Sequence, residues 1–216
     1  MKTKKIYLIR HGQTDYNLQG IVQGSKVNTS INELGTAQAN AFYEFYKDVN
    51  FQKIYTSKLN RSIQSVQQFI DKGIKWEAFE GLNEISWGYR DGTVITDDEN
   101  EYYFEVVRRW KEGEIDLKID GGESPREVQA RQKPVLDDIL ASDAENILIC
   151  MHGRAIRIFL CLMLNKDLKL MDEFKHENLC LYSLNYSEST GFELDKKCDI
   201  THLEVAGLRS EPRKTK

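Results

Sequence analysis

The sequence predicts an α/β fold, namely a three-layer α/β/α sandwich with a mainly parallel central sheet. Strand-like apolar segments alternate with segments of helical periodicity, as expected when helices cover both faces of a parallel sheet. Of the 216 residues, 40% are hydrophobic and 30% are charged, which suffices for a substantial buried core. No repeat, low-complexity tract or linker interrupts the chain, so we expect a single domain over residues 1–216.

The strands are predicted from short apolar runs that end in charged or turn-forming residues. The expected strands are Ile6–Ile9, Phe51–Thr56, Lys75–Phe79, Asn146–Met151, Leu179–Asn185 and Gly191–Lys196. The run Asn146–Met151 is apolar almost throughout, which indicates a central strand. The short run Lys75–Phe79 is better suited to an edge of the sheet.

The helices are predicted from apolar residues at helical spacing and from capping residues. They run from a cap at Ser30 or Asn32 to Tyr46, over Leu59–Ile70, over Asp97–Lys111, from a cap at Ser124 to Leu140, and over Ile156–Leu164. Pro125 suits the first turn of the helix after Ser124. We expect a long polar loop from His11 to about Ser30, and a polar C-terminal tail that frays.

Charge and hydropathy exclude several classes of partner. The net charge is only -4 and no basic stripe is interleaved with aromatic residues, so we expect no nucleic-acid partner. Every apolar run falls far short of the ~20 residues that cross a bilayer, so we expect no membrane partner. The basic start, Met1 to Lys5, precedes only about four apolar residues before Arg10, which is too few for an export signal.

The cysteines and histidines argue against disulfides and metal sites. Cys150 and Cys161 lie in apolar segments, and the four cysteines include no closely spaced pair. Reduced thiols and a cytoplasmic location are therefore expected. The histidines and cysteines lack metal-ligand spacing, so the sequence predicts no metal and no other cofactor. It allows a homodimer without defining the oligomeric state.

The first expected strand runs directly into Arg10, His11 and Gly12. An arginine offers a fixed positive charge to a phosphate, and a neutral imidazole can attack phosphorus. Because ligands bind beyond the carboxyl ends of parallel strands, we expect the chemistry here.

Two further strand ends carry candidate residues. Arg61 follows the second strand, where it and the amides of a helix start could hold an anion, although a surface arginine is the simpler interpretation. His152 and Gly153 follow the expected central strand and repeat the His-Gly pattern of the first. Packed core histidines are common, but two His-Gly strand ends in one chain favour a shared site.

Glu84 lies between apolar neighbours in a segment flanked by Gly81 and Gly88. Partial burial there would keep a proton available near neutrality, as a general acid requires. A solvated loop glutamate is the alternative.

Together these segments resemble the histidine phosphatase superfamily, also called the phosphoglycerate mutase-like family. The resemblance covers residues 6 to about 157 in order. The matching segments are Arg10–Thr14 with Asn17, Gln23 and Gly24; Ser57–Arg61; Leu82–Ile85 with Gly88 and Gly92; Gly122–Ser124 with Arg131; and His152–Gly153.

The resemblance implies a metal-independent phosphatase with a phosphoglycerate mutase-like fold. His11 would form a phosphohistidine, with its other ring nitrogen bonded to the backbone. Arg10, Arg61 and, if it is protonated, His152, with Gly153 and Gly24 beside them, would surround the phosphoryl oxygens. Glu84 would act as general acid and then as general base. Asn17 and Gln23 would be neutral donors at the rim or to the phosphate.

The sequence departs from the family's common pattern at Arg154, Asp91 and Ser25–Ile31. Arg154 either adds charge near the substrate or faces solvent, and the substrate stays undefined beyond a small phosphomonoester. The aromatic residues Tyr102, Tyr103, Phe104 and Trp110 either line a cavity or pack a helix, and packing is the simpler interpretation.

Three function classes remain in order of preference. Gln13 and Thr14 look more like the phosphatase branches than the mutases, which favours a phosphomonoesterase. A phosphoglycerate mutase, which must exclude water from the phosphohistidine, is the alternative. A catalytically silent module that binds a phospholigand is the third.

Overall fold

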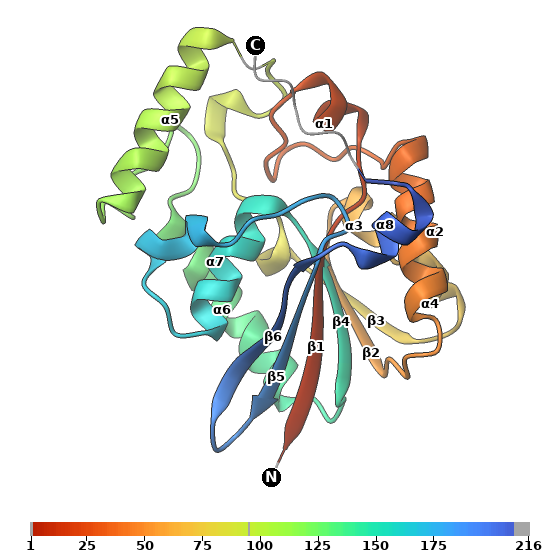
Figure 1. Cartoon of the computed structure of the whole chain (residues 1–216). Helices are drawn as coiled ribbons and strands as arrows, with labels where there is room; N and C mark the ends of the chain where they lie inside the picture. Colours follow the sequence, from red (N-terminus) through yellow and green to blue (C-terminus); the bar gives the residue numbers. More distant parts are fainter. Residues whose placement is uncertain (1, 95, 210–216) are drawn as a thin grey trace.

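A six-stranded sheet forms the centre of the molecule in the computed structural model, which describes residues 2–94 and 96–209 (Figure 1). Its strands are β1 (Thr3–Arg10), β2 (Lys53–Ser57), β3 (Lys75–Phe79), β4 (Asn146–Met151), β5 (Leu181–Ser187) and β6 (Gly191–Asp199), in the order β3-β2-β4-β1-β5-β6. The strands β3, β2, β4 and β1 are parallel, whereas β5 and β6 run antiparallel to their neighbours. The mainly parallel α/β sandwich predicted from the sequence is therefore confirmed.

Helices cover both faces of this sheet (Figure 1). On one side lie α2 (Glu33–Tyr46), α3 (Asn60–Gln64), α4 (Gln67–Asp71) and α8 (Thr201–Ala206), and on the other lie α6 (Pro125–Ala141) and α7 (Gly153–Met163). The remaining helices, α1 (Asp15–Gln19) and α5 (Asp97–Lys111), lie beyond the carboxyl ends of the parallel strands. Short 3-10 helices complete the fold: η1 (Glu80–Leu82), η2 (Gly88–Arg90) and η3 (Leu168–Glu173).

The capping residues explain where two helices begin. Asn32 accepts a hydrogen bond from the Gly35 amide at the start of α2. Ser124 and Glu127 form a reciprocal capping box at the start of α6, with Pro125 in the first turn. Both starts agree with the sequence-based prediction.

Two local expectations were wrong, and one helix was not anticipated. The single helix predicted over Leu59–Ile70 is split into α3 and α4, and Ser65 at the break accepts a hydrogen bond from the Gly12 amide and donates one to the Arg61 carbonyl. The polar loop after His11 contains α1, which Thr14 and Asn17 cap reciprocally. The segment after β6 forms α8. The extreme tail that was expected to fray lies outside the described residues.

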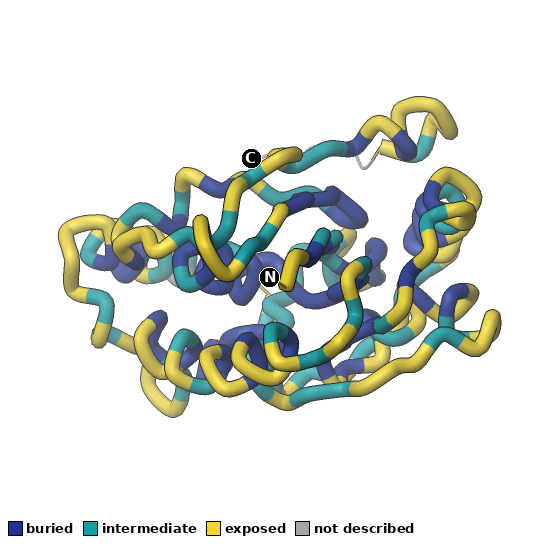
Figure 2. Tube along the Cα trace, turned by 90° about the horizontal axis from the view of Figure 1, so that it is seen from below, coloured by how far each residue is buried: buried dark blue, intermediate teal, exposed yellow. Residues whose placement is uncertain are grey.

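The core lies on both sides of the central strands, as the burial along the chain shows (Figure 2). In β4 every side chain from Ile147 to Met151 has 0% exposure, which matches its expected central position. Cys150 and Cys161 are buried free thiols. Among the described residues, no helix combines the length and apolar character needed to span a membrane.

Candidate active site

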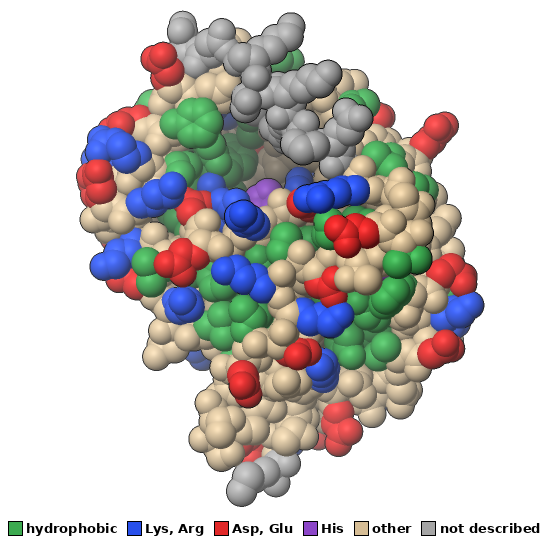
Figure 3. Space-filling view, viewed as in Figure 1, with side chains coloured by type: hydrophobic (Ala, Val, Ile, Leu, Met, Phe, Trp, Pro, Cys, Tyr) green, Lys and Arg blue, Asp and Glu red, His purple; other side chains and the backbone are tan. Residues whose placement is uncertain are grey.

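The register of the sheet places the two His-Gly motifs side by side. Arg10 at the end of β1 pairs with Met151 at the end of β4, and the His11 amide donates to the Met151 carbonyl over 3.0 Å. The rings of His11 and His152 consequently lie 5.1 Å apart between centroids. Figure 3 shows a hollow over this end of the molecule, in which a histidine side chain lies between Lys or Arg side chains.

His11 is a buried, oriented imidazole with 3% exposure. Its Nδ1 lies 2.7 Å from the Gly12 carbonyl oxygen, and because a carbonyl can only accept, Nδ1 carries the proton. Burial and the neighbouring Arg10 and Arg61 guanidinium groups hold the pKa of His11 well below its usual range. The ring is therefore neutral near pH 7, with a lone pair on Nε2.

Arg61 starts a directed chain of hydrogen bonds. Its Nε donates to Nδ1 of His152 over 3.2 Å, and since arginine only donates, the His152 proton lies on Nε2. That nitrogen donates to Ser57 Oγ over 2.7 Å. Ser57 Oγ lies 2.7 Å from Ser62 Oγ, which reaches the Leu59 carbonyl at 2.8 Å. The chain fixes the orientation of the Arg61 side chain, which is fully buried.

The condition that His152 be protonated is not met in this geometry. Both of its ring nitrogens are engaged within the protein, and burial together with Arg61 lowers the pKa of His152 well below its usual range. Arg61 itself keeps its charge, because burial lowers its pKa only to about 10. Its Nη1 and Nη2 donate to the carbonyl oxygens of Val27 and Gly24 at 2.6 and 3.4 Å.

Arg10 contacts a histidine that the sequence did not single out. Its Nη1 lies 3.2 Å from Nδ1 of His176, in the segment before β5. The His176 ring also packs on Gly153, where a Cβ atom would come within 2.9 Å of it. Asn178, two residues on, donates to the His11 carbonyl oxygen over 3.0 Å. The segment before β5 thus belongs to the site.

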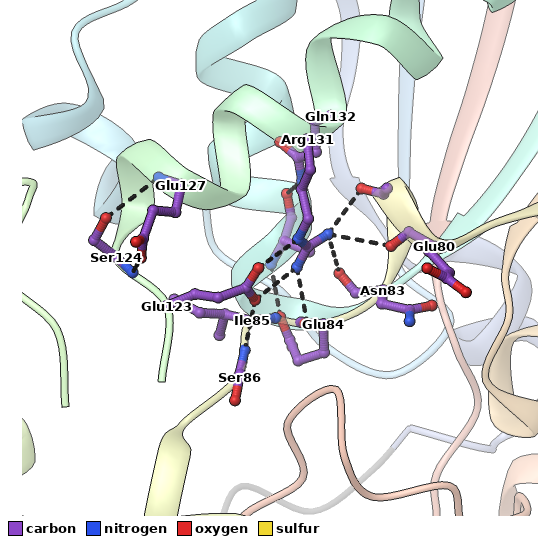
Figure 4. Close-up of polar contacts among 12 residues, drawn as sticks. Glu80, Asn83, Glu84, Ile85, Ser86, Glu123, Ser124, Glu127, Arg131 and Gln132 are labelled. Atoms are coloured by element: carbon purple, nitrogen blue, oxygen red, sulfur yellow. Dashed lines mark hydrogen bonds and ion pairs between the residues drawn. The ribbon is translucent and has the colours of Figure 1, made fainter. Parts of the chain in front are cut away.

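Glu84 lies at the start of α7 (Figure 4). Its Oε1 accepts hydrogen bonds from the amides of Ile85 and Ala155, and its Oε2 accepts one from the Arg154 amide. Glu84 is buried, with 7% of the residue exposed. It therefore caps the helix that begins beside His152.

Arg131 of α6 holds the loop that carries Glu84 (Figure 4). Its Nη1 donates to the carbonyl oxygens of Gly81 and Asn83, and its Nη2 donates to that of Glu84. Its Nε donates to Glu123 Oε1 over 2.7 Å, and Oε2 of Glu123 accepts the Ser86 amide at 2.8 Å. Arg131 is thus a positioning residue.

The loop after His11 holds Asn17, Gln23 and Gly24. Asn17 Oδ1 accepts hydrogen bonds from the Thr14 amide and the Asn178 side chain, and Gln23 bonds to the Thr14 hydroxyl. These two amides brace the loop. Gly24 is required by close packing, since a Cβ there would lie 2.0 Å from Oδ1 of Asp91.

Comparison with known proteins identifies the family. A model of the histidine phosphatase superfamily (branch 1) matches residues 6–199. The chain belongs to this superfamily. It is 26% identical over 203 residues to a putative phosphoserine phosphatase 2 of Hydrogenobacter thermophilus, covering 93% of this chain and 99% of that protein. It is also 31% identical to a 2,3-bisphosphoglycerate-dependent phosphoglycerate mutase of Allorhizobium ampelinum, with 95% and 97% covered.

Solved structures of the superfamily share the fold. A mycobacterial glucosyl-3-phosphoglycerate phosphatase superposes with a TM-score of 0.78 at 23% identity, covering 91% of this chain and 99% of that one. The predicted family resemblance and the phosphoglycerate mutase-like fold are therefore confirmed.

Two of the three departures from the superfamily's common pattern, Asp91 and Arg154, lie inside the protein, whereas residues 25–31 are half-buried or exposed. Asp91 packs against Gly24, and burial raises its pKa. Arg154 does not face solvent, because its side chain is only 6% exposed. Its Nη1 bonds to Asp172 at 2.7 Å and its Nη2 donates to the Tyr103 hydroxyl at 2.9 Å.

The aromatic residues of α5 occupy three different environments. Trp110 is 1% exposed and packs in the core beneath the Arg154 guanidinium, at 5.3 Å from its ring centroid. Tyr102 and Phe104 are 42% and 61% exposed and lie at the surface, where the Phe104 ring contacts that of Tyr103 at 5.5 Å between centroids. Tyr103 contacts Arg154 and lies at the edge of the site.

Proposed function

We propose that the protein is a metal-independent phosphomonoesterase that hydrolyses a small phosphorylated metabolite through a phosphohistidine on His11. The hydrogen bond from His11 Nδ1 to the Gly12 carbonyl supports this most, because it leaves Nε2 as an oriented nucleophile. Burial near two arginines keeps that nitrogen unprotonated.

In the first half of the reaction, the Nε2 lone pair attacks phosphorus and the bond from phosphorus to the ester oxygen breaks. Protonated Glu84 gives its proton to the departing oxygen, which leaves as an alcohol. Arg10 and Arg61 neutralise charge on the phosphoryl oxygens, and their hydrogen bonds to His176 and His152 fix both guanidinium groups in advance.

In the second half, a water molecule attacks the phosphohistidine while the Glu84 carboxylate accepts a proton from it. The bond from phosphorus to Nε2 breaks, inorganic phosphate leaves, and both His11 and Glu84 return to their starting protonation states. His152 and Gly153 complete the phosphate site: His152 as a neutral ring that orients Arg61, and Gly153 as the start of α7.

A generic aryl phosphate tests the proposal. We expect turnover of p-nitrophenyl phosphate that persists in excess EDTA and disappears in His11→Ala, with unchanged thermal unfolding. Rapid quenching should trap a phosphoenzyme that is labile to acid and stable to alkali. Turnover that EDTA abolishes, or that survives in His11→Ala, would contradict the proposed chemistry. A folded wild-type protein that binds phosphate without turnover would be a phospholigand-binding module.

A phosphoglycerate mutase is the second candidate, since a mutase is among the relatives with nearly full coverage. The two activities differ in the fate of the phosphohistidine, which a mutase returns to a phosphoglycerate hydroxyl. Interconversion of 2- and 3-phosphoglycerate that outruns phosphate release would favour the mutase.

A further inference from the structure

Two guanidinium groups beside the phosphate site share one carboxylate. Nη1 of Arg154 and Nη1 of Arg157 both bond to the same oxygen of Asp172. The side chains of Arg154, Arg157 and Asp172 are 6%, 18% and 14% exposed, so solvent screens their charges poorly. This cluster therefore carries an excess positive charge in a mostly buried position.

The cluster adjoins the phosphate site through His176. The His176 ring packs on Gly153, the residue between His152 and Arg154, and its Nδ1 accepts a hydrogen bond from Arg10. Because Nδ1 accepts, Nε2 carries the proton of the neutral ring. Burial and the nearby Arg10, Arg157 and Arg154 lower the pKa of His176 well below its usual range, which keeps the ring neutral. His176 thus offers an N–H donor between Arg10 and the arginine cluster.

Resting on the proposed function, we propose that Arg154, Arg157 and His176 form a second anion-binding subsite, and that the substrate is a phosphomonoester carrying a second anionic group. A carboxylate or a second phosphate would balance the excess charge and accept a hydrogen bond from the Nε2–H of His176. Two residues of α5 position the Arg154 guanidinium: the Tyr103 hydroxyl accepts its hydrogen bond, and the Trp110 ring packs against it. A substrate with a neutral remainder would leave the excess charge unpaired.

Phosphonates that cannot be hydrolysed separate binding from turnover. We would compare 2-amino-4-phosphonobutyrate with 3-aminopropylphosphonate, which lacks only the carboxylate, and propane-1,3-bisphosphonate with propylphosphonate. Calorimetry should show about tenfold tighter binding for the member that carries the second anionic group, in at least one of the two pairs. The pair that responds distinguishes a carboxylate from a second phosphate.

Variants then locate the effect. Arg154→Gln, Arg157→Gln and His176→Gln should each reduce the preference to threefold or less, whereas Arg154→Lys, which keeps the charge, should retain part of it. Arg126→Gln, at an exposed ion pair with Asp116, is the matched control and should leave the preference unchanged. If Arg154→Gln does not fold, Arg157→Gln and His176→Gln decide the outcome.

The subsite proposal would be overturned if the wild-type protein bound both members of each phosphonate pair with equal affinity. It would also be overturned if the preference for the second anionic group survived in all three variants. Failure of the proposed function would look different, because p-nitrophenyl phosphate turnover would be absent while the binding preference stayed measurable.

Discussion

The guanidinium of Arg61 and the imidazole of His152 form a donor and acceptor pair 3.2 Å apart, and this contact fixes the tautomer of the histidine. Two residues 91 positions apart in the chain thereby become one unit. The Oγ of Ser57 accepts the hydrogen bond from the second ring nitrogen, Nε2, of His152. The geometry of the unit depends on a hydroxyl group that has no direct contact with Arg61.

Removing that hydroxyl should weaken phosphate binding. In Ser57→Ala the buried Nε2–H of His152 loses its acceptor, so the ring no longer holds Arg61 in place. We expect kcat/KM for an aryl phosphate to fall about tenfold, mainly through KM. Ser62→Ala, one step further along the chain, should have a smaller effect. Steady-state kinetics on both variants check this, and equal losses would argue against a directed chain.

The buried histidines should make the protein sensitive to acid. Burial lowers the pKa values of His11, His152 and His176 in the folded state, so the unfolded chain binds more protons below its ordinary histidine pKa of about 6.5. Stability should be flat above that pH and fall below it, by up to about 1.4 kcal/mol per pH unit for each histidine. Urea titrations between pH 5 and pH 8 measure this slope.

The lowered pKa of His11 should also shift the acid limb of the kcat/KM profile to lower pH. Since the folded-state pKa of His11 is lowered, the nucleophile stays neutral at pH 6.5, and protonation of His11 alone should not reduce kcat/KM until the pH is well below that value. An acid limb centred at pH 6.5 or above that tracks His11 protonation would contradict this.

The site residues that lie at the ends of the parallel strands could be predicted from the sequence, because these reactive side chains come directly after strand-like apolar runs. Arg10, His11 and His152 come directly after apolar runs, and parallel strands bring their carboxyl ends to one edge. His176 and Asn178 lie instead before β5, which runs antiparallel to β1. Only the strand order reveals that the start of β5 lies beside the end of β1.

The tautomers and charge states of the site residues also could not be predicted from the sequence. The pattern around His152 predicts a histidine at the phosphate site, but its neutral state depends on Arg61 and Ser57 meeting its two nitrogens. Similarly, Arg154 could face either solvent or substrate until Asp172 and Tyr103 were located. Contacts between segments that are distant in sequence decide both points.

Gly24 should tolerate no side chain. In Gly24→Ala the new Cβ would lie 2.0 Å from Asp91 Oδ1, so either the buried Asp91 side chain or the loop whose carbonyl oxygens accept hydrogen bonds from Arg61 must shift. We expect a loss of stability of about 1–3 kcal/mol together with reduced kcat/KM. In the Gly24→Ala/Asp91→Ala double variant the clash is absent, so the double-mutant cycle should show a favourable coupling energy. Additive effects would show that some other contact excludes the side chain.

Replacing Arg131 by lysine should lower both stability and kcat, although the positive charge is kept. Its guanidinium donates to four carbonyl oxygens of the segment Glu80–Glu84 and to both oxygens of Glu123, and a single ammonium cannot reproduce this planar set. Arg131→Lys should lower stability by about 2 kcal/mol and lower kcat more than it raises KM, because Glu84 is displaced while Arg10 and Arg61 are not. Arg126→Lys on the same helix, at an exposed ion pair, is the control and should change neither quantity. A loss confined to KM would mean that Arg131 serves phosphate binding and that the Glu84 loop keeps its position without it.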